Sequence, residues 1–163
     1  MLKVGTAAGL VASLMGGAVA LAQPTDSRYI NRVESPVFET SGDHQAITRR
    51  ALTCVAQIVS PGTVDAPAVR SSDVEAGIIV ATNSFRYVYG ALRPTGRTTL
   101  TFEARDGRFR IVHSNIEQSQ DGGQGWLPIG TWRFSGGDAA RAAIEAINMR
   151  LAQCVQTSQN ENW

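Results

Sequence analysis

The feature that most constrains this fold is a pair of alternating segments joined by Asp106-Gly107, within the stretch TTLTFEARDGRFRIVHSNIEQ. Apolar and polar residues alternate on both sides of that dipeptide, which is the pattern of two half-buried strands. An Asp-Gly pair favours a two-residue type I′ turn, in which both central residues have positive φ. The sequence therefore predicts a β-hairpin whose register is set at its turn.

This register pairs Arg105 with Arg108 and Glu103 with Arg110, and it sorts the hairpin side chains onto two faces. The apolar face carries Leu100, Phe102, Ala104, Phe109, Ile111 and His113. The opposite face carries Thr101, Glu103, Arg105, Arg108, Arg110 and Val112. We expect the apolar face to lie beneath helices and the charged face to meet solvent.

Two amphipathic helices are predicted from apolar residues that recur at three- and four-residue steps. The first follows Asp43, whose carboxylate can accept amide hydrogens of the first turn, and it ends at Pro61-Gly62. The second follows Gly136-Gly137-Asp138, which ends one segment and caps the next. The apolar stripes consist of Ile47, Ala51, Cys54, Val55 and Ile58 in the first helix and Ala140, Ile144, Ile147, Leu151 and Cys154 in the second.

The remaining segments are predicted to be strands and loops. Residues 36–39 form a short first strand, residues 63–72 a loop, and residues 74–90 a strand region with Val74, Ala76, Ile78 and Val80 on one face. The stretch QDGGQGWLPIG has no phosphate-binding motif and is predicted to be a surface loop. The order strand, helix, strands, helix predicts an α+β fold, in which two helices pack on one face of an antiparallel meander sheet.

The N-terminal segment, residues 1–22, has the pattern of a signal peptide. Lys3 precedes an uncharged apolar run, and Ala20-Leu21-Ala22 provides the small-x-small cleavage pattern. The alternative, a transmembrane anchor, is weaker because the run is rich in glycine and has no basic residue on its far side. We expect an exported protein, periplasmic or secreted, with no membrane span after cleavage, a flexible leader (23–35), one domain (36–156) and a polar tail (157–163).

Cys54 and Cys154 are the two cysteines of the chain, and both lie on the apolar stripes of their helices. An even cysteine count in an exported protein favours a disulfide, which would close a loop of about 100 residues. Two buried free thiols are the alternative, and no sequence signal favours a nucleophilic cysteine. No metal-ligand spacing involves the cysteines, His44 or His113, so we expect neither a metal site nor a cofactor.

The charge balance of the chain restricts the kinds of partner that it is expected to bind. Lys3 is the only lysine, and the other basic residues are 14 arginines, which equal the 14 acidic residues in number. A chain of near-zero net charge is not expected to bind nucleic acid, or an acidic membrane surface, through bulk electrostatics.

The candidate interaction site lies on the charged face of the hairpin and comprises Glu103, Arg105, Arg108 and Arg110. Guanidinium groups on an open sheet suit a carboxylate or a phosphate, although an ordinary solvated strand face has the same pattern. The segment of Phe85, Tyr87 and Tyr89 is a second candidate surface. His44, in a helix's first turn, is expected to be exposed, and His113 to be a hydrogen-bonded residue of the core or its rim.

The sequence contains no nucleophile–base or metalloprotease motif such as G-x-S-x-G or H-E-x-x-H. We therefore predict a non-catalytic interaction module whose partner is an unidentified envelope protein. A carrier of a small apolar ligand, held in a pocket between helices and sheet, is the alternative. A hydrolase without a recognisable motif is the third and least favoured hypothesis.

The segments DVEAGIIVATNSFRY and TLTFEARDGRFRIVHSNIEQ resemble a bacterial secreted family, domain of unknown function 4468. The shared features are an acidic residue before Gly77-Ile78-Ile79 and the hairpin motif Arg105-Asp106-Gly107-Arg108-Phe109-Arg110, and the similarity covers residues 43–118 best. Where the family has a lysine at the first hairpin position, this chain has Arg105. The resemblance implies a TATA-binding-protein-like (TBP-like) fold and supplies no activity, cofactor or catalytic residue.

Overall fold

The computed structural model describes residues 27–62, 67–120 and 125–158. Its elements, in chain order, are β1 (Arg32–Glu34), β2 (Phe38–Glu39), α1 (His44–Ile58), β3 (Val69–Asp73), β4 (Ile78–Arg86), β5 (Thr95–Arg105), β6 (Arg108–Ser119), β7 (Leu127–Pro128) and α2 (Gly137–Thr157). The predicted signal segment, residues 1–22, lies outside the described residues. Within the described part, no helix is long and apolar enough to cross a membrane.

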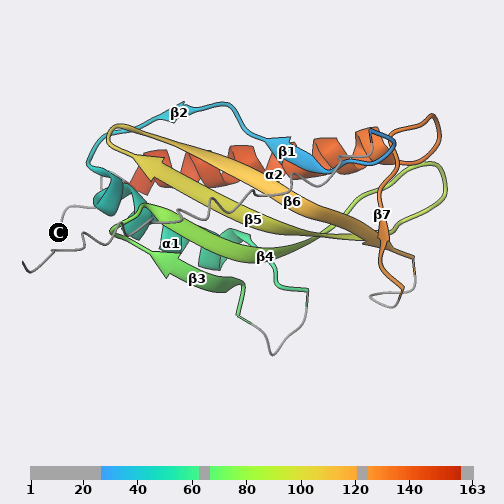
Figure 1. Cartoon of the computed structure of the whole chain (residues 1–163), viewed down its shortest axis with the longest axis horizontal. Coiled ribbons are helices and arrows are strands. Elements are labelled where there is room, and N and C mark those ends of the chain that lie inside the picture. The colour runs from blue at the N-terminus through green and yellow to red at the C-terminus, as the bar shows by residue number, and fades with distance from the viewer. Residues whose placement is uncertain (1–26, 63–66, 121–124, 159–163) are drawn as a thin grey trace, which may run out of the picture.

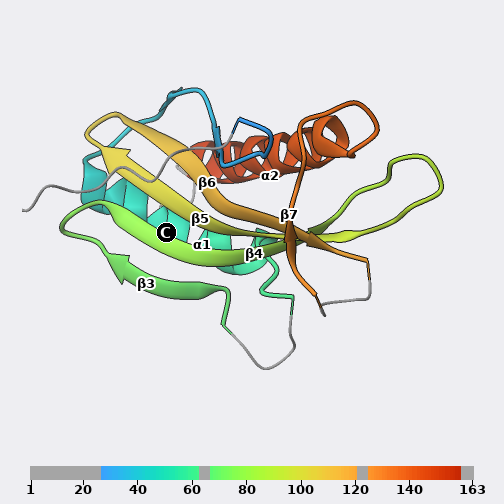
Figure 2. The same ribbon diagram turned by 45° about the vertical axis from the view of Figure 1, so that its right-hand side comes forward.

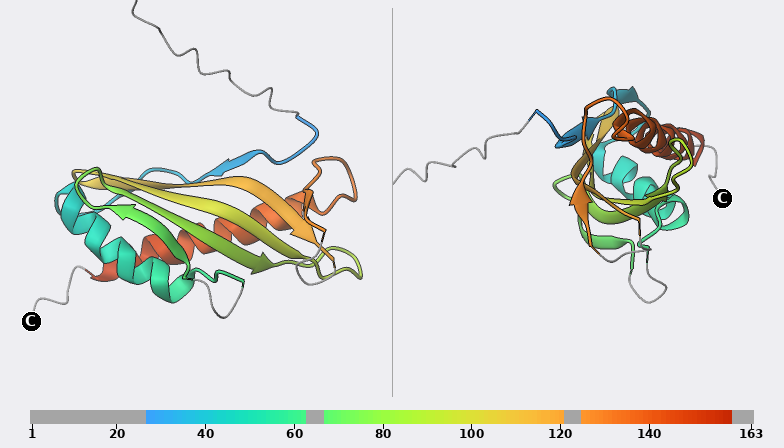
Figure 3. Two further views of the ribbon diagram at one scale, coloured as in Figure 1. Left: turned by 60° about the horizontal axis from the view of Figure 1, so that its bottom comes forward. Right: turned by 90° about the vertical axis from the view of Figure 1, so that its right-hand side faces the viewer.

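The strands form one antiparallel sheet in the order β1-β6-β5-β4-β3, with the long β5–β6 hairpin at its centre (Figure 1). β2 pairs with β6 beside the hairpin turn, and β7 pairs with β6 near its other end (Figure 2). Both helices lie on the same side of this sheet (Figure 3). The predicted α+β architecture is therefore confirmed. We call the sheet face opposite the helices the open face, because no described helix covers it.

The hairpin register is the predicted one. Arg105 pairs with Arg108, Glu103 with Arg110, and Phe102 with Ile111. The turn itself differs from the prediction, because only Gly107 has a positive φ, at 74°; a type I′ turn would need one at Asp106 as well. Tertiary contacts account for the difference: the Gly107 amide donates to the Gly42 carbonyl at 2.9 Å, and the Gly107 carbonyl accepts from Thr40 at 2.9 Å.

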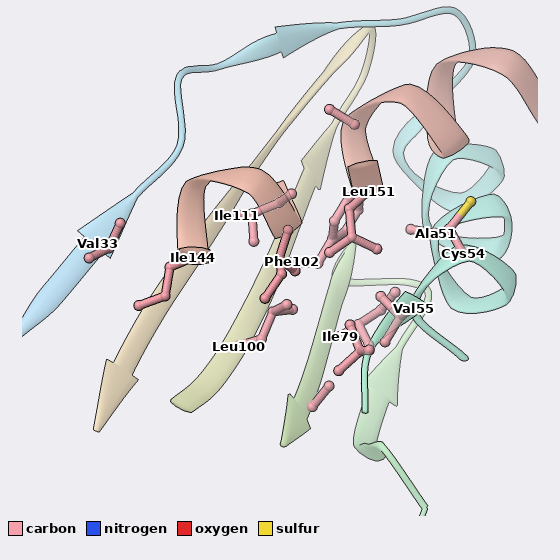
Figure 4. Close-up of a cluster of buried hydrophobic side chains, with 14 of the residues drawn as sticks. Val33, Ala51, Cys54, Val55, Ile79, Leu100, Phe102, Ile111, Ile144 and Leu151 are labelled. Atoms are coloured by element: carbon pink, nitrogen blue, oxygen red, sulfur yellow. The ribbon is translucent and has the colours of Figure 1, made fainter. Parts of the chain in front are cut away.

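The core fills the space between the covered face of the sheet and the two helices (Figure 4). Ala51 and Val55 of α1 and Ile144 and Leu151 of α2 are fully buried. They point toward equally buried side chains of the central strands, among them Ile79, Leu100, Phe102 and Ile111. Burial of this apolar surface is the main stabilising contribution to the fold, and most of it comes from one face of the sheet, although Val112 on the other face is buried as well.

A disulfide joins Cys54 of α1 to Cys154 of α2, with the two Cα atoms 5.9 Å apart. The bridge predicted from the export signal and the apolar stripes is thus present. It links two helices that already pack side by side, and it spans 100 residues of chain. The two helices are therefore held together covalently beneath the sheet.

Two predicted boundaries are wrong. The flexible leader was expected to extend to Ser35, yet β1 lies within it, and Ile30 and Val33 are 3 % and 2 % exposed. The second helix begins at the predicted Gly136-Gly137-Asp138, with Gly136 as its N-cap and no side chain that caps it. The predicted loop 63–72 contains most of β3. Very short or polar strands such as β1 and β3 show no apolar alternation, so their pairing with β6 and β4 decides their structure.

The prediction that Val74, Ala76, Ile78 and Val80 share one strand face is correct for Ile78 and Val80 and wrong for Val74 and Ala76. Residues 74–77 form a turn, in which the Asp73 carboxylate accepts from the Ala76 amide at 2.9 Å. β4 begins only at Ile78, and its buried side chains are Ile79, Ala81, Asn83 and Phe85. Ile78 and Val80 therefore belong to the open face, because the run of apolar residues crosses a turn at which the strand period restarts.

Candidate functional site

The candidate site is the end of the open face beside the hairpin turn, and we call Glu103, Arg105, Arg108 and Arg110 the hairpin cluster. The register places Glu103 directly opposite Arg110, and Arg105 directly opposite Arg108. These four side chains line a shallow pocket of about 230 Å³ together with Val37 and Phe109. The structure therefore brings all four sequence-predicted residues together on one surface.

Arg110 is already paired. Its Nε and Nη2 atoms each lie 2.7 Å from Oε2 of Glu103, and its Nη1 atom lies 3.9 Å from Oε2 of Glu34. Glu34 also pairs with Arg32, and the hydrogen bond from Arg32 is the main reason that the pKa of Glu34 lies below its ordinary value. The charge of Arg110 is thus largely neutralised by its two carboxylate neighbours.

Arg105 and Arg108 differ from Arg110. Among the residues that the structure describes, neither guanidinium has a side-chain hydrogen bond or an ion pair, although Glu39 of β2 lies directly opposite Arg108 on its other side. Like charges in directly opposed cross-strand positions destabilise a sheet slightly, and a bound anion would remove that repulsion. The free binding capacity of the hairpin cluster therefore lies in these two arginines.

The hairpin turn is attached to the start of α1 through His44 and Asp106, a contact that the sequence analysis missed. Nδ1 of His44 lies 2.8 Å from Oδ1 of Asp106, and the His44 amide donates to the same oxygen at 2.9 Å. Nε2 of His44 lies 3.0 Å from the carbonyl oxygen of Glu75. His44 is thus engaged rather than simply exposed, and its role is to fix the turn against the helix.

This arrangement favours the charged imidazolium, because both ring nitrogens face acceptors. The hydrogen bond to Asp106 is the main cause that raises the pKa of His44 above its ordinary value, and desolvation opposes it. The same hydrogen bond lowers the pKa of Asp106. No sequence signal pointed to this pair, since the two residues are 62 positions apart.

His113 lies on the covered face and is fully buried. Its Nε2 atom lies 2.9 Å from Oδ1 of Asn148, and its Nδ1 atom lies 2.9 Å from Oγ1 of Thr98. A neutral ring that donates to Asn148 and accepts from Thr98 satisfies both contacts. Burial lowers the pKa of His113 to about 4. The structure therefore places His113 as a hydrogen-bonded core residue, as the sequence analysis expected.

The aromatic segment is not the exposed surface that the sequence favoured. Phe85 and Tyr87 are 7 % and 4 % exposed, and burial raises the pKa of the Tyr87 hydroxyl to about 12. Phe85 lies so close over Gly96 that a Cβ atom there would be 2.3 Å from its ring. Only Tyr89 reaches the surface, where it lines a groove of about 430 Å³ with Leu92, Trp132 and Phe134.

The architecture defines the class of the protein: an α+β domain in which two disulfide-linked helices cover one face of an antiparallel sheet. Solved structures share this fold. The chain is similar to a DUF4468 family protein from Bacteroides ovatus, with a TM-score of 0.57 and 15% identity over 84% of this chain and 91% of that one. It is also similar to a TBP-like protein from Parabacteroides distasonis, with a TM-score of 0.57 and 10% identity over 77% of this chain and 92% of that one.

The family resemblance seen in the hairpin motif is thus confirmed as a likeness of fold. Comparison of the sequence with protein-family models and with curated proteins finds no match. At 15% and 10% identity the similarity concerns the fold alone, and a shared fold does not imply a shared function. Information on function therefore lies in the surface residues of this chain.

Proposed function

We propose that this chain is an exported, non-catalytic binding module that holds an acidic segment of another envelope protein at the hairpin cluster. The observation that carries the proposal is the pair Arg105 and Arg108, which are directly opposed and form no ion pair among the described residues, although Glu39 of β2 lies across from Arg108. Guanidinium groups bind carboxylates through charge-assisted hydrogen bonds, which are among the stronger polar contacts.

The surroundings of the two arginines favour a peptide over a free ion. Val37, which is 56 % exposed, lies in the same shallow pocket, which Phe109 also lines. An acidic segment with one apolar side chain could therefore cover Val37 while its carboxylates pair with Arg105 and Arg108. Interfaces commonly combine an apolar contact with arginine contacts in this way.

Export is supported by the Cys54–Cys154 disulfide, because disulfides form and persist in oxidising compartments such as the periplasm. The signal pattern of residues 1–22 is the second support. The structural neighbours in Bacteroides ovatus and Parabacteroides distasonis are bacterial proteins, which is compatible with a bacterial envelope location.

The alternative function, a carrier of a small apolar ligand, requires a cavity between the helices and the sheet. Side chains from both layers fill that space in the described residues, with Phe102, Ile111, Ile144 and Leu151 all fully buried. No observation therefore favours the carrier over the binding module.

The test is a capture experiment with charge-reversed variants. The Arg105→Glu/Arg108→Glu protein and the wild type are immobilised and exposed to an envelope extract of the source bacterium, and the captured proteins are identified by mass spectrometry. We expect a specific acidic partner to be lost from the variant, because two attractive contacts become repulsive.

The matched control is Arg141→Glu/Arg150→Glu, which makes the same charge change at two exposed positions of α2. The control should retain the partner. Equal capture by the two variants, or equal loss from both, would show that the hairpin cluster is an ordinary solvated strand face.

A further inference from the structure

A second hollow lies on the open face, eight residues along β5 from Arg105. Its side chains come from four strands, and we call it the threonine hollow: Arg70 of β3, Thr82 of β4, Arg97 and Thr99 of β5, and Asn115 and Glu117 of β6. It has a volume of about 390 Å³. None of these residues belongs to the hairpin cluster, and no sequence pattern predicts that they meet.

Two irregularities of the sheet create the hollow. The pairing of β3 with β4 shifts between Val69 and Ser71, which leaves Arg70 as the extra residue. The pairing of β5 with β6 shifts between Arg97 and Thr99, and Asn115, on the β6 side of that shift, has a φ of 51°. β-Bulges redirect side chains and occur often beside functional sites. Here two of them aim side chains at one place from opposite sides.

The centre of the hollow is the cross-strand pair Thr82 and Thr99. Nε of Arg70 donates to Oγ1 of Thr82 at 2.8 Å, and Nδ2 of Asn115 donates to Oγ1 of Thr99 at 3.2 Å. Because each hydroxyl oxygen already accepts a hydrogen bond, each hydroxyl proton is left to donate to something else. Among the described residues, neither hydroxyl is found donating a hydrogen bond.

The two arginines of the hollow are fixed differently. Arg97 donates from Nε to Oε2 of Glu117 at 2.7 Å, and its guanidinium carbon lies 4.2 Å from the ring centroid of Trp126. Arg97 is thus held in place and neutralises Glu117. Arg70 has no carboxylate partner among the described residues, and only its Nε atom makes a hydrogen bond. Its two terminal nitrogens therefore remain available, and its charge is the uncompensated charge of the hollow.

The free groups of the hollow are consequently mostly donors, with a net positive charge. We propose that the threonine hollow binds a small oxyanion, a carboxylate or a phosphate group, through the terminal nitrogens of Arg70 and the hydroxyls of Thr82 and Thr99. A guanidinium fork matches two oxygens of either group, and the flanking hydroxyls complete its hydrogen bonding. The proposal is independent of the proposed function, because it uses other residues and a different kind of ligand.

The test is a titration of the ¹⁵N-labelled mature protein with sodium phosphate and, separately, with sodium acetate at constant ionic strength. We expect the amide signals of Thr82, Thr99 and Asn115 to shift in a saturable manner. Tighter binding of phosphate would assign the site to phosphate groups, and tighter binding of acetate would assign it to carboxylates. Both outcomes support the proposal that the threonine hollow binds an oxyanion.

Two variants identify the binding groups. Arg70→Gln should weaken binding by about tenfold or more, since a charge-assisted contact is lost, and Thr82→Val should weaken it by about threefold to tenfold while keeping nearly the same shape. Arg141→Gln, which removes an exposed charge from α2, should bind within about twofold of the wild type. If the Arg70→Gln protein does not fold, the affinity of the Thr82→Val protein is sufficient to test the proposal.

The proposal would be overturned if the Thr82→Val and Arg70→Gln proteins bound both anions as tightly as the wild type. It would also be overturned if the signals that shift were those around Arg105 and Arg108 instead of the hollow. That second result would leave the proposed function of the hairpin cluster intact, so the two hypotheses fail separately.

Discussion

The two faces of the central sheet are built from alternate residues of the same strands, yet one face packs against helices and the other meets solvent. Phe102 on the covered face is fully buried, whereas its neighbour Thr101 on the open face is only partly buried. The covered face packs against two helices that a disulfide joins. The open face carries arginines and threonines whose hydrogen-bonding capacity is incompletely used within the described residues. The comparison indicates that the covered face supplies most of the stability of the domain, whereas the open face keeps polar groups available at the surface.

The largest expected effect is on the covered face, from removal of the disulfide. Cys54→Ala/Cys154→Ala should lower the free energy of unfolding by about 4–5 kcal/mol, because the bridge closes a 100-residue loop and restricts the unfolded chain. Urea unfolding of the wild type and the variant measures the difference. A loss below about 1 kcal/mol would mean that helix packing alone holds α1 and α2 in place.

The next prediction compares adjacent residues on the two faces. Phe102→Ala should cost about 3–5 kcal/mol, since it removes a fully buried ring that stacks on Phe109 at a centroid distance of 5.0 Å. Thr101→Ala should change stability by no more than about 0.5 kcal/mol. Urea unfolding measures both changes. Similar losses of unfolding free energy in the two variants would contradict the conclusion that the covered face supplies most of the stability.

A third prediction concerns His113 on the covered face and the acid side of the stability profile. Its pKa is about 4 in the folded protein, against an ordinary value of 6.5. The unfolded chain therefore binds a proton first as the pH falls. The contribution of neutral His113 to the free energy of unfolding is fully present above pH 6.5 and is lost between about 6.5 and 4, by about 3 kcal/mol in all.

His113→Gln removes this titration and is the matched variant. The free energy of unfolding should fall less steeply between pH 7 and pH 4.5 in the variant than in the wild type. Parallel profiles would show that His113 is accessible to protons in the folded state.

The smallest effect is expected at the edge of the open face, where His44 contacts Asp106. The pKa of His44 is raised, so its stabilising contribution is present below its ordinary pKa and is lost as the pH rises through the folded value. Asp106→Asn should lower the pKa of His44, because the main cause of the shift is removed. NMR titration of the imidazole signals measures this, and an unchanged His44 pKa would contradict the contact. The two histidines thus respond to acid in opposite directions.

The sequence predicted the hairpin, its register and both helices, because alternation and helical spacing are local properties. The Cys54–Cys154 bridge could be expected for the same reason, since both cysteines lie on predicted apolar stripes. The turn type was wrong because contacts with residues 40–44 shape it. β1 and β3 were missed because three to five residues without alternation carry no signal of their own.

The binding surfaces were predicted less completely. The hairpin cluster follows from the register, so its four residues could be grouped from the sequence. The threonine hollow could not be predicted, because Arg70 and Asn115 reach it only through irregularities in strand pairing. Such shifts depend on how distant strands align, and a residue pattern that is read locally does not contain that information.

The pairing of β1 with β6 also bears on how the chain reaches its final form. Arg32 lies opposite Ser114 and Glu34 opposite Val112, so β1 pairs with a strand about 80 residues later in the sequence. Contacts of such long range are slow to form, because the intervening chain must be ordered before they stabilise anything. A chain that crosses a membrane starting from its N-terminus could not close this domain until β6 had followed. The topology itself would then delay folding at least until β6 had crossed.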